Sequence, residues 1–442
     1  MAASVFDSAM FRDLFGDAEV GTLFTDSADV RAMLLVEGTL AKVQGELGMI
    51  PTDSAAAIHR ASIEGLVDPS NLSRETGQSA VVVPALVKAF RAEMNAPEHA
   101  QYAHWGATSQ DIMDTGLVLR LRQVVGIYET RLVSLVKALG ALAEAHADLP
   151  MAGRTYAQSA TPTSFGAVVA SWGMPLIRHL ERLEQLKPRL LNVSLSGAAG
   201  TLSAMGDKGP KVRSGLAKAL NLGDPGGSWH STRDAMAEFS GWMTMLTGSL
   251  AKMGEDLILL TQSGVQEVAL AQSGGSSTMP QKSNPVLPSL LASLGAHNNA
   301  LNASVQGAVV HRQQRDGVAW FAEWLALPQM CMATARSLSA AQELATGMQP
   351  NADRMLAGID DGLGLIYAEA LSFALTAHMS RPDAQATVKA LCKQAQADGI
   401  SIAKLALEKW PEQNLSGLFS PAAQLGTAPD EAMVFARAAK LH

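Results

Sequence analysis

Apolar residues recur along much of the chain at the three-to-four-residue spacing of amphipathic helices. The clearest pattern covers residues 234–263, which contain no proline and predict a helix of about 45 Å at ~1.5 Å per residue. The same spacing predicts helices at 29–47, 128–147, 286–312 and 361–380. Helices of this length need partners along their whole length, so we predict a long central helical bundle.

No segment shows a convincing alternation of apolar and polar residues, the pattern typical of a half-buried strand. The short apolar run at 80–83 fits a buried helix turn instead. Methionines on the apolar faces are expected to fill the core, because their flexible side chains fit irregular gaps. We therefore predict an all-α fold.

Two stretches interrupt the helical pattern and suggest domain boundaries, one near 97–106 and one near 347–351. The predicted division is an N-terminal helical domain at 1–103, a central long-helix bundle domain at 104–350 that carries the loop 274–285, and a C-terminal helical domain at 351–442. No internal repeat or low-complexity segment argues against this division.

Composition and charge restrict the class of ligand. The 442 residues are 48% hydrophobic and only 5% aromatic, which is typical of helical bundles. A formal net charge of -7 does not favour a nucleic-acid partner, because phosphates attract basic proteins. A small anionic substrate would need a local group of positive charges against this overall sign.

The cysteines and the N-terminus bear on cellular location. Cys331 and Cys392 lie far apart and form no metal-type spacing, so a reducing cytoplasm is the simplest setting. No basic region followed by an apolar run opens the chain, so we expect no secretory signal. No apolar stretch reaches ~18 residues, so we expect no membrane-spanning helix.

The most informative polar segment is Gly-Gly-Ser-Ser-Thr-Met-Pro-Gln-Lys-Ser-Asn-Pro at 274–285. It combines small residues and two prolines with hydroxyl, ammonium and carboxamide groups. This mixture suits a loop that closes over a small anionic substrate. A plain linker between helices is the alternative, but a linker has no need of Lys282 or Asn284.

Three further polar segments interrupt the helices, at 104–115, 153–166 and 229–234. In the first, Thr108 and Ser109 precede Asp111 and could cap a helix, a role compatible with binding a carboxylate at the helix N-terminus.

Two arginines in the other segments have structural alternatives as well. Arg154 could form a structural ion pair, and Arg233 could pair with the adjacent Asp234 at a helix start.

The loop matches G-S-S-x-M-P-x-K-x-N-P, the signature of the fumarase/aspartase superfamily, at every fixed position. The other polar segments resemble further regions of that superfamily in the same order, so the resemblance covers nearly the whole chain. It implies an all-α, three-domain subunit and a homotetramer whose active sites are shared between subunits. It implies no metal and no organic cofactor.

The resemblance also assigns roles within the site. It makes Ser276 the base that removes a proton next to a carboxylate, with Lys282 and Asn284 stabilising the resulting charge. The residues it implies for holding substrate carboxylates are Thr108, Ser109, Thr155 and Gln158, and the loop adds Ser277 and Met279 as substrate contacts.

Two departures from the superfamily's lyases concern proton donors. Tyr156 and Gln78 stand where those lyases carry histidine. An amine or hydroxide leaves poorly without an acid, whose help is worth about 10²–10⁴-fold. A carboxylate leaves well without one, because the pKa of its conjugate acid is about 4. The chain therefore fits a reaction in which a carboxylate adds or departs.

A third departure concerns phosphate recognition. Arg315 is retained from the nucleotide-binding pattern of adenylosuccinate lyases, but Trp320 and Trp324 replace its downstream serine and arginine. Large apolar rings cannot bind phosphate in a bidentate manner. Packing of the bundle is an alternative role for the two tryptophans.

The pattern W-x-A-E-W-x-x-L-P at 320–328 resembles the bacterial 3-carboxy-cis,cis-muconate cycloisomerase family, as do the segments 229–234 and 197–202. The resemblance implies intramolecular addition of a carboxylate across a diene, giving 4-carboxymuconolactone in protocatechuate (β-ketoadipate) degradation. Such a tricarboxylate needs several cationic contacts. The candidates are Arg154, Arg233, Lys282 and Arg315, with His104 and His230 as donors.

The group that protonates carbon is open among Ser276, Tyr156 and His104. Tyr156 could instead be a core ring with a hydrogen-bonded hydroxyl. An adenylosuccinate- or argininosuccinate-type lyase is the second functional hypothesis. A non-catalytic scaffold is the third, and the intact set of Ser276, Lys282 and Asn284 argues against it.

Overall fold

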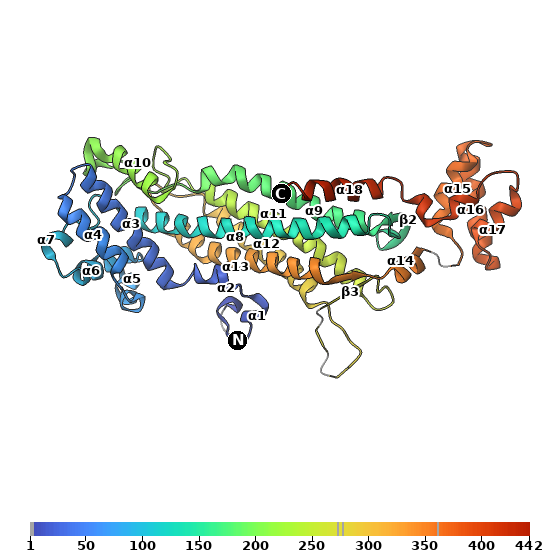
Figure 1. Cartoon of the computed structure of the whole chain (residues 1–442), viewed down its shortest axis with the longest axis horizontal. Coiled ribbons are helices and arrows are strands. Elements are labelled where there is room, and N and C mark those ends of the chain that lie inside the picture. The colour runs from blue at the N-terminus through green and yellow to red at the C-terminus, as the bar shows by residue number, and fades with distance from the viewer. Residues whose placement is uncertain (1–3, 272–273, 276–277, 360–361) are drawn as a thin grey trace. The chain divides into compact units, whose positions relative to one another are not determined.

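The protein was analysed as a computed structural model, which describes residues 4–271, 274–275, 278–359 and 362–442. Helices dominate these residues (Figure 1). They form two compact units: the first comprises Met1–Thr130, His179–Gly248 and Leu294–Ser337, and the second Arg131–Arg178, Ser249–Ser293 and Leu338–His442. The five longest helices of the described chain contribute residues to both units.

These long helices are α8 (Ser109–Ala145), α9 (Phe165–Leu190), α11 (Asp234–Thr261), α12 (Val286–Gly307) and α13 (Gly317–Gly347). The shorter helices before and between them are α1 (Arg12–Phe15), α2 (Ala18–Thr22), α3 (Asp26–Glu46), α4 (Thr52–Glu64), α5 (Ser73–Ser79), α6 (Val83–Glu93), α7 (Pro97–Ala100) and α10 (Gly209–Leu220). The C-terminal helices are α14 (Ala352–Ile359), α15 (Ala368–Leu375), α16 (Arg381–Asp398), α17 (Ile402–Lys409) and α18 (Ala428–Ala439). Short 3₁₀ segments occupy Val5–Asp7, Pro69–Leu72, Ser203–Lys208, Leu365–Tyr367, Ser416–Phe419 and Pro421–Gln424.

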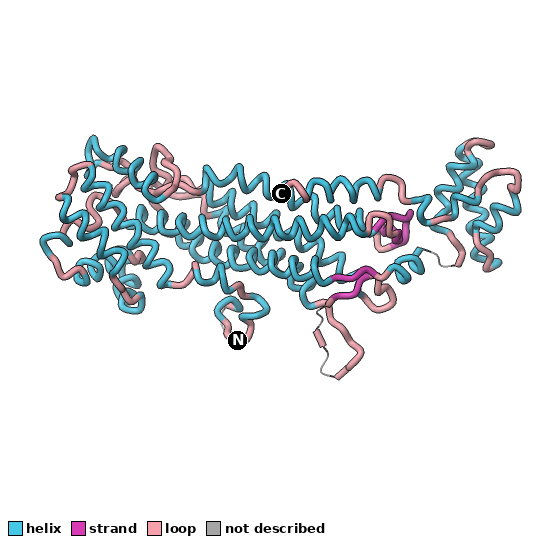
Figure 2. Tube along the Cα trace, viewed as in Figure 1, coloured by secondary structure: helices cyan, strands magenta, loops and turns pink. Residues whose placement is uncertain are grey.

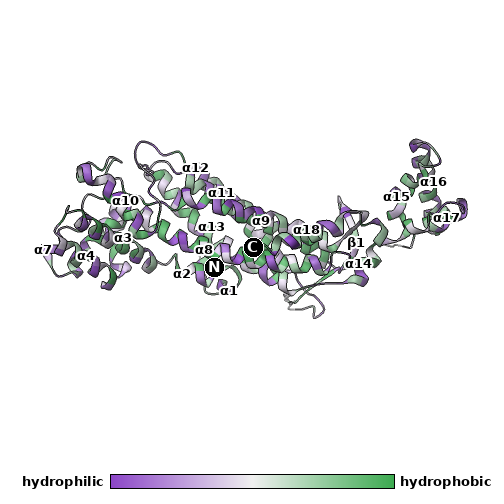
Figure 3. Ribbon diagram, turned by 45° about the horizontal axis from the view of Figure 1, so that its top comes forward, coloured by the Kyte–Doolittle hydropathy of each residue, from purple (hydrophilic) through white to green (hydrophobic). Residues whose placement is uncertain are grey.

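The core of the first unit forms where α3 packs against α4. Gly38 of α3 permits this close approach, because an added Cβ would lie 1.8 Å from the Ser62 hydroxyl oxygen of α4. Apolar and polar residues are interleaved on both helices, as amphipathic packing requires (Figure 3). The apolar positions that are buried include Val36, Leu40 and Ile58.

The second unit has its own apolar cluster, in which α15 packs against α16. Leu371 and Leu375 of α15 are fully buried there, together with Ala384 and Ala395 of α16. The cluster gives the C-terminal segment a separate core. The predicted division into three domains, at 1–103, 104–350 and 351–442, remains a prediction.

Four short strands, which no apolar alternation in the sequence indicated, are present among the described residues. Strands β1 (Pro150–Thr155) and β2 (Gln158–Ser164) form an antiparallel hairpin, and β3 (Val268–Leu270) pairs with β4 (Met348–Pro350), as Figure 2 shows in magenta. The hairpin strands are rich in Thr, Ser, Gly and Pro and lack a clear apolar alternation. Backbone pairing rather than an apolar pattern therefore holds the hairpin.

Several predicted helix bounds also needed correction. Helix α8 begins at Ser109 instead of 128. Its first two turns bury the polar residues Gln110, Asp111, Asp114 and Thr115, and the apolar residues that follow, such as Val118, Leu121 and Val125, are buried as well. The helix expected at 361–380 is reduced to a 3₁₀ turn and the short α15. In the described ranges, no helix is long and apolar enough to cross a membrane.

Candidate active site

The predicted site residues fall into two groups, one in each unit. Those of the first unit lie at the N-terminus of α8 and in the segments that contact it: His104, Thr108, Ser109, His230, Arg233 and Arg315. Those of the second unit lie at the tip of the β1–β2 hairpin and in the loop before α12: Arg154, Thr155, Tyr156, Gln158, Met279, Lys282 and Asn284. Ser276 and Ser277 lie outside the described residues.

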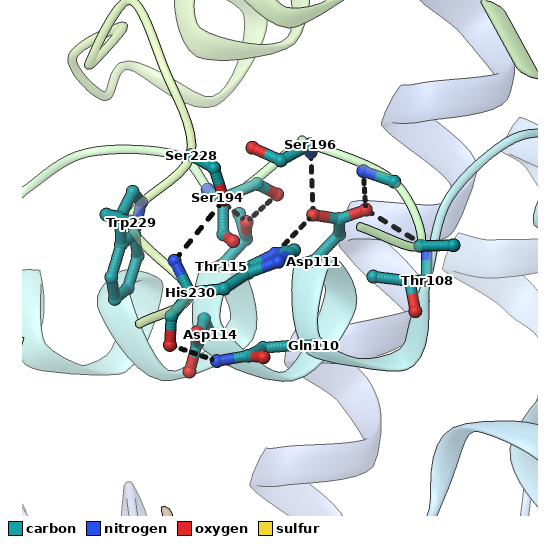
Figure 4. Close-up of polar contacts among 12 residues, drawn as sticks. Thr108, Gln110, Asp111, Asp114, Thr115, Ser194, Ser196, Ser228, Trp229 and His230 are labelled. Carbon is teal, nitrogen blue, oxygen red and sulfur yellow. Dashed lines mark hydrogen bonds and ion pairs between the residues drawn. The ribbon is translucent and has the colours of Figure 1, made fainter. Parts of the chain in front are cut away.

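A buried carboxylate, Asp111, organises the first group (Figure 4). Its Oδ2 accepts hydrogen bonds from the backbone N–H groups of Thr108 and Gly197 at 3.0 and 2.9 Å. Its Oδ1 accepts from the Ser196 N–H at 2.7 Å and from His230 Nε2 at 2.8 Å. The bond to Thr108 has the geometry of a capping box, in which a third-position acid reaches back to the residue before the helix. Asp111 thus joins three segments that are distant in sequence.

Arg315 sits at the same helix end. Its Nε donates to Gln110 Oε1 at 2.9 Å, and its Nη2 lies 3.2 Å from the Thr108 hydroxyl oxygen. Gln110 in turn donates to the His230 carbonyl oxygen at 2.9 Å. Arg315 itself is exposed, so a guanidinium faces solvent beside the N-terminus of α8. A guanidinium next to the positive end of a helix dipole is suited to binding a carboxylate.

His104 forms a tight pair with a buried acid. Its Nδ1 lies 2.6 Å from Glu37 Oε1, and the Glu37 side chain is only 1% exposed. Burial lowers the pKa of His104, but the charge and hydrogen bond of Glu37 outweigh burial, so the pKa is raised above its ordinary value. His104 also has a positive φ of 61°, a strained conformation for a non-glycine residue.

Arg233 is fully buried and bound on both sides by acids. Its guanidinium donates to Asp114 at 2.7 and 3.2 Å and to Glu323 through Nε at 3.0 Å. The Trp229 ring lies 4.7 Å from the guanidinium carbon. The partners are therefore Asp114 and Glu323 rather than the adjacent Asp234. These bonds give Arg233 a structural role, and we do not retain it as a substrate contact.

His230 is likewise buried, with its side chain 1% exposed and bound to Asp111. It acts through Asp111 and so positions the N-terminus of α8.

Trp320 is buried against Trp324, with ring centroids 4.7 Å apart, which confirms the packing alternative for Trp320. Trp324 is half-buried and lines a cavity of about 640 Å³ together with α3 and α5 residues.

In the second unit, Arg154 of the hairpin makes a bidentate ion pair. Its Nη1 and Nη2 lie 2.7 and 2.6 Å from the two carboxylate oxygens of Glu267, which is 1% exposed. The hydrogen bond to Glu267, opposed by burial, raises the pKa of Arg154. The structural ion pair that the sequence left open is therefore present, and it joins the hairpin to the residue before β3.

Tyr156 occupies the hairpin turn, where Thr155 pairs with Gln158. Tyr156 and Ala157 have φ values of 51° and 60°, as a two-residue type I′ turn requires. The Tyr156 side chain is fully exposed, at 101%. The alternative of a core ring was therefore wrong. The hairpin instead presents Tyr156 to its surroundings on a strained turn.

The loop before α12 is closed at its base by Gly274 and Asn284. The Gly274 N–H donates to the Asn284 carbonyl oxygen at 2.9 Å, and the Asn284 N–H donates back at 2.8 Å. This pairing brings the two ends of the segment together. Lys282 and Met279 are exposed, and the Lys282 N–H donates to the Met279 carbonyl oxygen at 3.1 Å.

Sequence reasoning missed several polar residues that shape these groups, namely Glu37, Gln110, Asp111 as a buried acceptor, and Glu267. Glu37 is a polar residue within an otherwise apolar stretch of α3, which is the one signal that could have identified it. Among the described residues, no set of three or more His, Cys, Asp or Glu side chains is arranged to hold a metal ion.

Comparisons with known proteins agree on one family. A family model described as "Lyase" matches residues 18–297. The 3-carboxy-cis,cis-muconate cycloisomerase of Pseudomonas aeruginosa is 37% identical over 430 residues, covering 95% of this chain and 94% of that protein. The enzyme of the same name from Acinetobacter baylyi is 34% identical, covering 96% of this chain and 97% of its own.

A solved structure gives the same result for the fold. The 3-carboxy-cis,cis-muconate lactonizing enzyme from Pseudomonas putida matches with a TM-score of 0.93 at 33% identity, covering 98% of this chain and 99% of that one. The all-α fumarase/aspartase-type fold predicted from the sequence is thereby confirmed.

The buried Arg233 cluster predicts a large effect on stability. Arg233→Met should lower the free energy of unfolding by about 3–5 kcal/mol, because Asp114 and Glu323 would remain buried without their cation. The measurement is urea unfolding at pH 8, with Arg189→Met as the control for an exposed ion pair with Glu238.

The loss for Arg233→Met should be smaller at acidic pH, where protonation removes the uncompensated charge. Burial already raises the pKa of Glu323 in the intact protein, against the opposing effect of Arg233. An unfolding midpoint equal to that of the wild type at pH 8 would contradict a structural role for Arg233.

Proposed function

The chain belongs to the lyase family that includes the 3-carboxy-cis,cis-muconate cycloisomerases, and we propose that it catalyses their reaction. In that reaction a carboxylate oxygen of 3-carboxy-cis,cis-muconate adds to a carbon of the conjugated diene. The neighbouring carbon, next to a carboxylate, takes up a proton, and the product is 4-carboxymuconolactone. The observation that carries this proposal is the similarity over the whole chain to enzymes of this name.

The residues of the chain fit this chemistry better than elimination of an amine. Tyr156 and Gln78 occupy the places of two histidines, so the proton donors that an amine leaving group needs are absent from those positions. A carboxylate needs no such donor, because it is stable in its ionised form. The apolar Trp320–Trp324 pair also offers no bidentate donors to a nucleotide phosphate.

We assign recognition of one substrate carboxylate to the N-terminus of α8. Thr108 and Ser109 open the helix, and Arg315 places its guanidinium beside them through Gln110. The helix N–H groups and the guanidinium supply complementary donors for an anion. On the second unit, the exposed hairpin residues Thr155 and Gln158 are assigned to another carboxylate.

We assign proton transfer and charge stabilisation to the loop before α12. Ser276 is proposed as the group that exchanges the proton with carbon, with Tyr156 and His104 as alternatives. Charge that develops on the adjacent carboxylate would be stabilised by Lys282 and the Asn284 amide. Ser277 and Met279 are proposed as neighbouring substrate contacts. The backbone bridge between Gly274 and Asn284 brings the two ends of this segment together.

We also propose that the chain works as a homotetramer in the cytoplasm, with active sites shared between subunits. Support for association comes from large apolar side chains that are exposed in the single chain. They are Met245 at 48%, Leu259 at 55%, Val318 at 69% and Leu325 at 72%, on α11 and α13. The exposed Tyr156 turn supports a site completed by another subunit, and the two free cysteines fit a reducing compartment.

The proposed reaction predicts a simple spectroscopic result. Purified protein mixed with 3-carboxy-cis,cis-muconate should rapidly abolish the ultraviolet band of the diene, because lactone formation removes the conjugation. Adenylosuccinate in a parallel cuvette should show no change. Turnover of adenylosuccinate alone would overturn the proposal in favour of the superfamily lyase.

Loop variants should separate catalysis from folding. Ser276→Ala should reduce kcat by several orders of magnitude, and Lys282→Met should lower kcat/KM by about 10²–10³-fold, as loss of a transition-state charge contact does. Lys440→Met, which removes an exposed lysine paired with Glu144, is the matched control. A kcat for Ser276→Ala within tenfold of the wild-type value would contradict the assigned role of Ser276. An unchanged kcat/KM for Lys282→Met would contradict the assigned role of Lys282.

Shared active sites predict complementation between inactive variants. A His104→Asn protein and a Lys282→Met protein, denatured together and refolded, should form mixed tetramers with more activity than either parent. The gain arises because some sites would combine intact residues from different subunits. Each variant refolded alone is the control. Mixed oligomers, demonstrated by mass, that show no gain would contradict sharing between these two residues.

A further inference from the structure

A second cationic pocket lies beside the helix end assigned to substrate binding. It has a volume of about 430 Å³ and is lined by Lys88, Arg91, His104 and Ser109, with an apolar wall of Val83, Pro84 and Val87. Its residues come from α6, from the segment after α7 and from the first position of α8. Three basic side chains around one small pocket contrast with the net charge of -7 for the whole chain.

We propose that this pocket binds a carboxylate of the substrate, and that Glu37 is the residue that positions His104 for this contact. The inference rests on the proposed function and extends it to four residues, of which Glu37, Lys88 and Arg91 had no assigned role. The helix N-terminus, the hairpin and the loop were each assigned to a substrate carboxylate, and this pocket adds charged donors beside the first of them.

The contacts of the two α6 cations leave them able to bind an anion. Arg91 donates from Nη2 to the Ala103 carbonyl oxygen at 2.7 Å, which fixes the guanidinium next to His104. One bond uses one of the five N–H donors of an arginine. Lys88 lies 2.6 Å from Glu75 Oε1, but both side chains are largely exposed, at 73% and 45%. Such a surface pair is weak, so a substrate carboxylate can displace it.

Glu37 fixes the orientation of the His104 ring. With Glu37 ionised, its oxygen 2.6 Å from Nδ1 accepts the hydrogen on Nδ1, so the opposite ring nitrogen, Nε2, lies on the side of the ring away from Glu37. The same ring lines the pocket. The other Glu37 oxygen, Oε2, is buried without a hydrogen-bond partner among the described residues. Holding a carboxylate in this state is costly, and a cationic His104 offsets the cost.

The charged groups around His104 determine how the contact responds to pH. Burial disfavours the cationic form of His104, and the positive charge of Arg91 disfavours it further. The negative charges of Glu37 and Asp111 favour the cation, and the net effect is a raised pKa for His104. Lys88 adds a further positive charge on the pocket wall. His104 is therefore cationic below this raised pKa, and affinity for the substrate should fall as the pH rises through it. Without the Glu37 charge, burial would lower the pKa and the fall would begin at lower pH.

The first experiment measures kcat and KM for 3-carboxy-cis,cis-muconate in Lys88→Met and Arg91→Met. Each should raise KM about tenfold while changing kcat much less, because a charged hydrogen bond made equally in ground and transition states is lost. Lys42→Met, an exposed residue of α3, is the control. A wild-type KM in both variants would overturn the pocket as a substrate contact.

The second experiment tests Glu37 through the pH dependence of KM. In Glu37→Gln the rise of KM with pH should begin at lower pH than in the wild type, and Glu37→Asp should restore part of the difference. Glu46→Gln, an exposed acid on the same helix, is the control. A merely structural role for Glu37 would leave the pH profile of KM unchanged. A wild-type pH profile in a folded Glu37→Gln protein would therefore overturn the positioning role.

Binding of tricarballylate, a saturated tricarboxylate, separates this inference from the proposed function. Calorimetry of the wild type against Lys88→Met and Arg91→Met needs no turnover. If the wild type leaves the muconate unchanged but the variants bind tricarballylate about tenfold more weakly, the reaction assignment fails and the pocket stands. Equal affinity in all three proteins would overturn the pocket whatever the reaction.

Discussion

The arrangement of the first unit depends on the need to satisfy one buried carboxylate. Asp111 is fully buried, and an isolated buried charge would cost far more than a domain's net stability. Four donors meet it, from the helix start, from residues 196–197 and from His230. Because these donors must converge on one side chain, the N-terminus of α8 and two remote loops are held together. The exposed Arg315 depends on this arrangement through Gln110.

The same principle of paired burial recurs at the other sites. Arg233 neutralises Asp114 one helical turn below Asp111, and Arg154 neutralises Glu267 where the hairpin meets the start of β3. His104 and Glu37 form a third buried pair. Each pair lies beside residues to which we assign substrate contact. These pairs neutralise charges that burial would otherwise make costly, so they hold the structure around the assigned contacts rather than supply free positive charge.

Elements with an apolar stripe were easier to predict from the sequence than elements held by polar contacts. The helix predicted at 29–47 is present as α3, Asp26–Glu46. Its apolar stripe, which includes Val30, Met33 and Leu40, is buried and was therefore visible in the sequence. The helix at 128–147 was predicted without its first half, although the buried Val118, Leu121 and Val125 continue its apolar spacing there; only the first two turns bury polar residues, among them Asp111 and Asp114. The hairpin was missed because its Thr- and Ser-rich strands carry no apolar alternation. The loop and the residues Thr108, Ser109 and Arg315 were identified from the pattern of a known family.

The sequence alone determined the helical class, the long bundle helices and the family, because apolar periodicity and a fixed loop pattern are local properties of the chain. Only the tertiary structure decided which charges are paired. Arg233 could have faced a ligand or Asp234, yet it is bound by Asp114 and Glu323 from other helices. Glu37 precedes His104 by 67 positions, and their contact exists only after folding. Electrostatic partners are chosen by distance in space, and sequence spacing does not encode that distance.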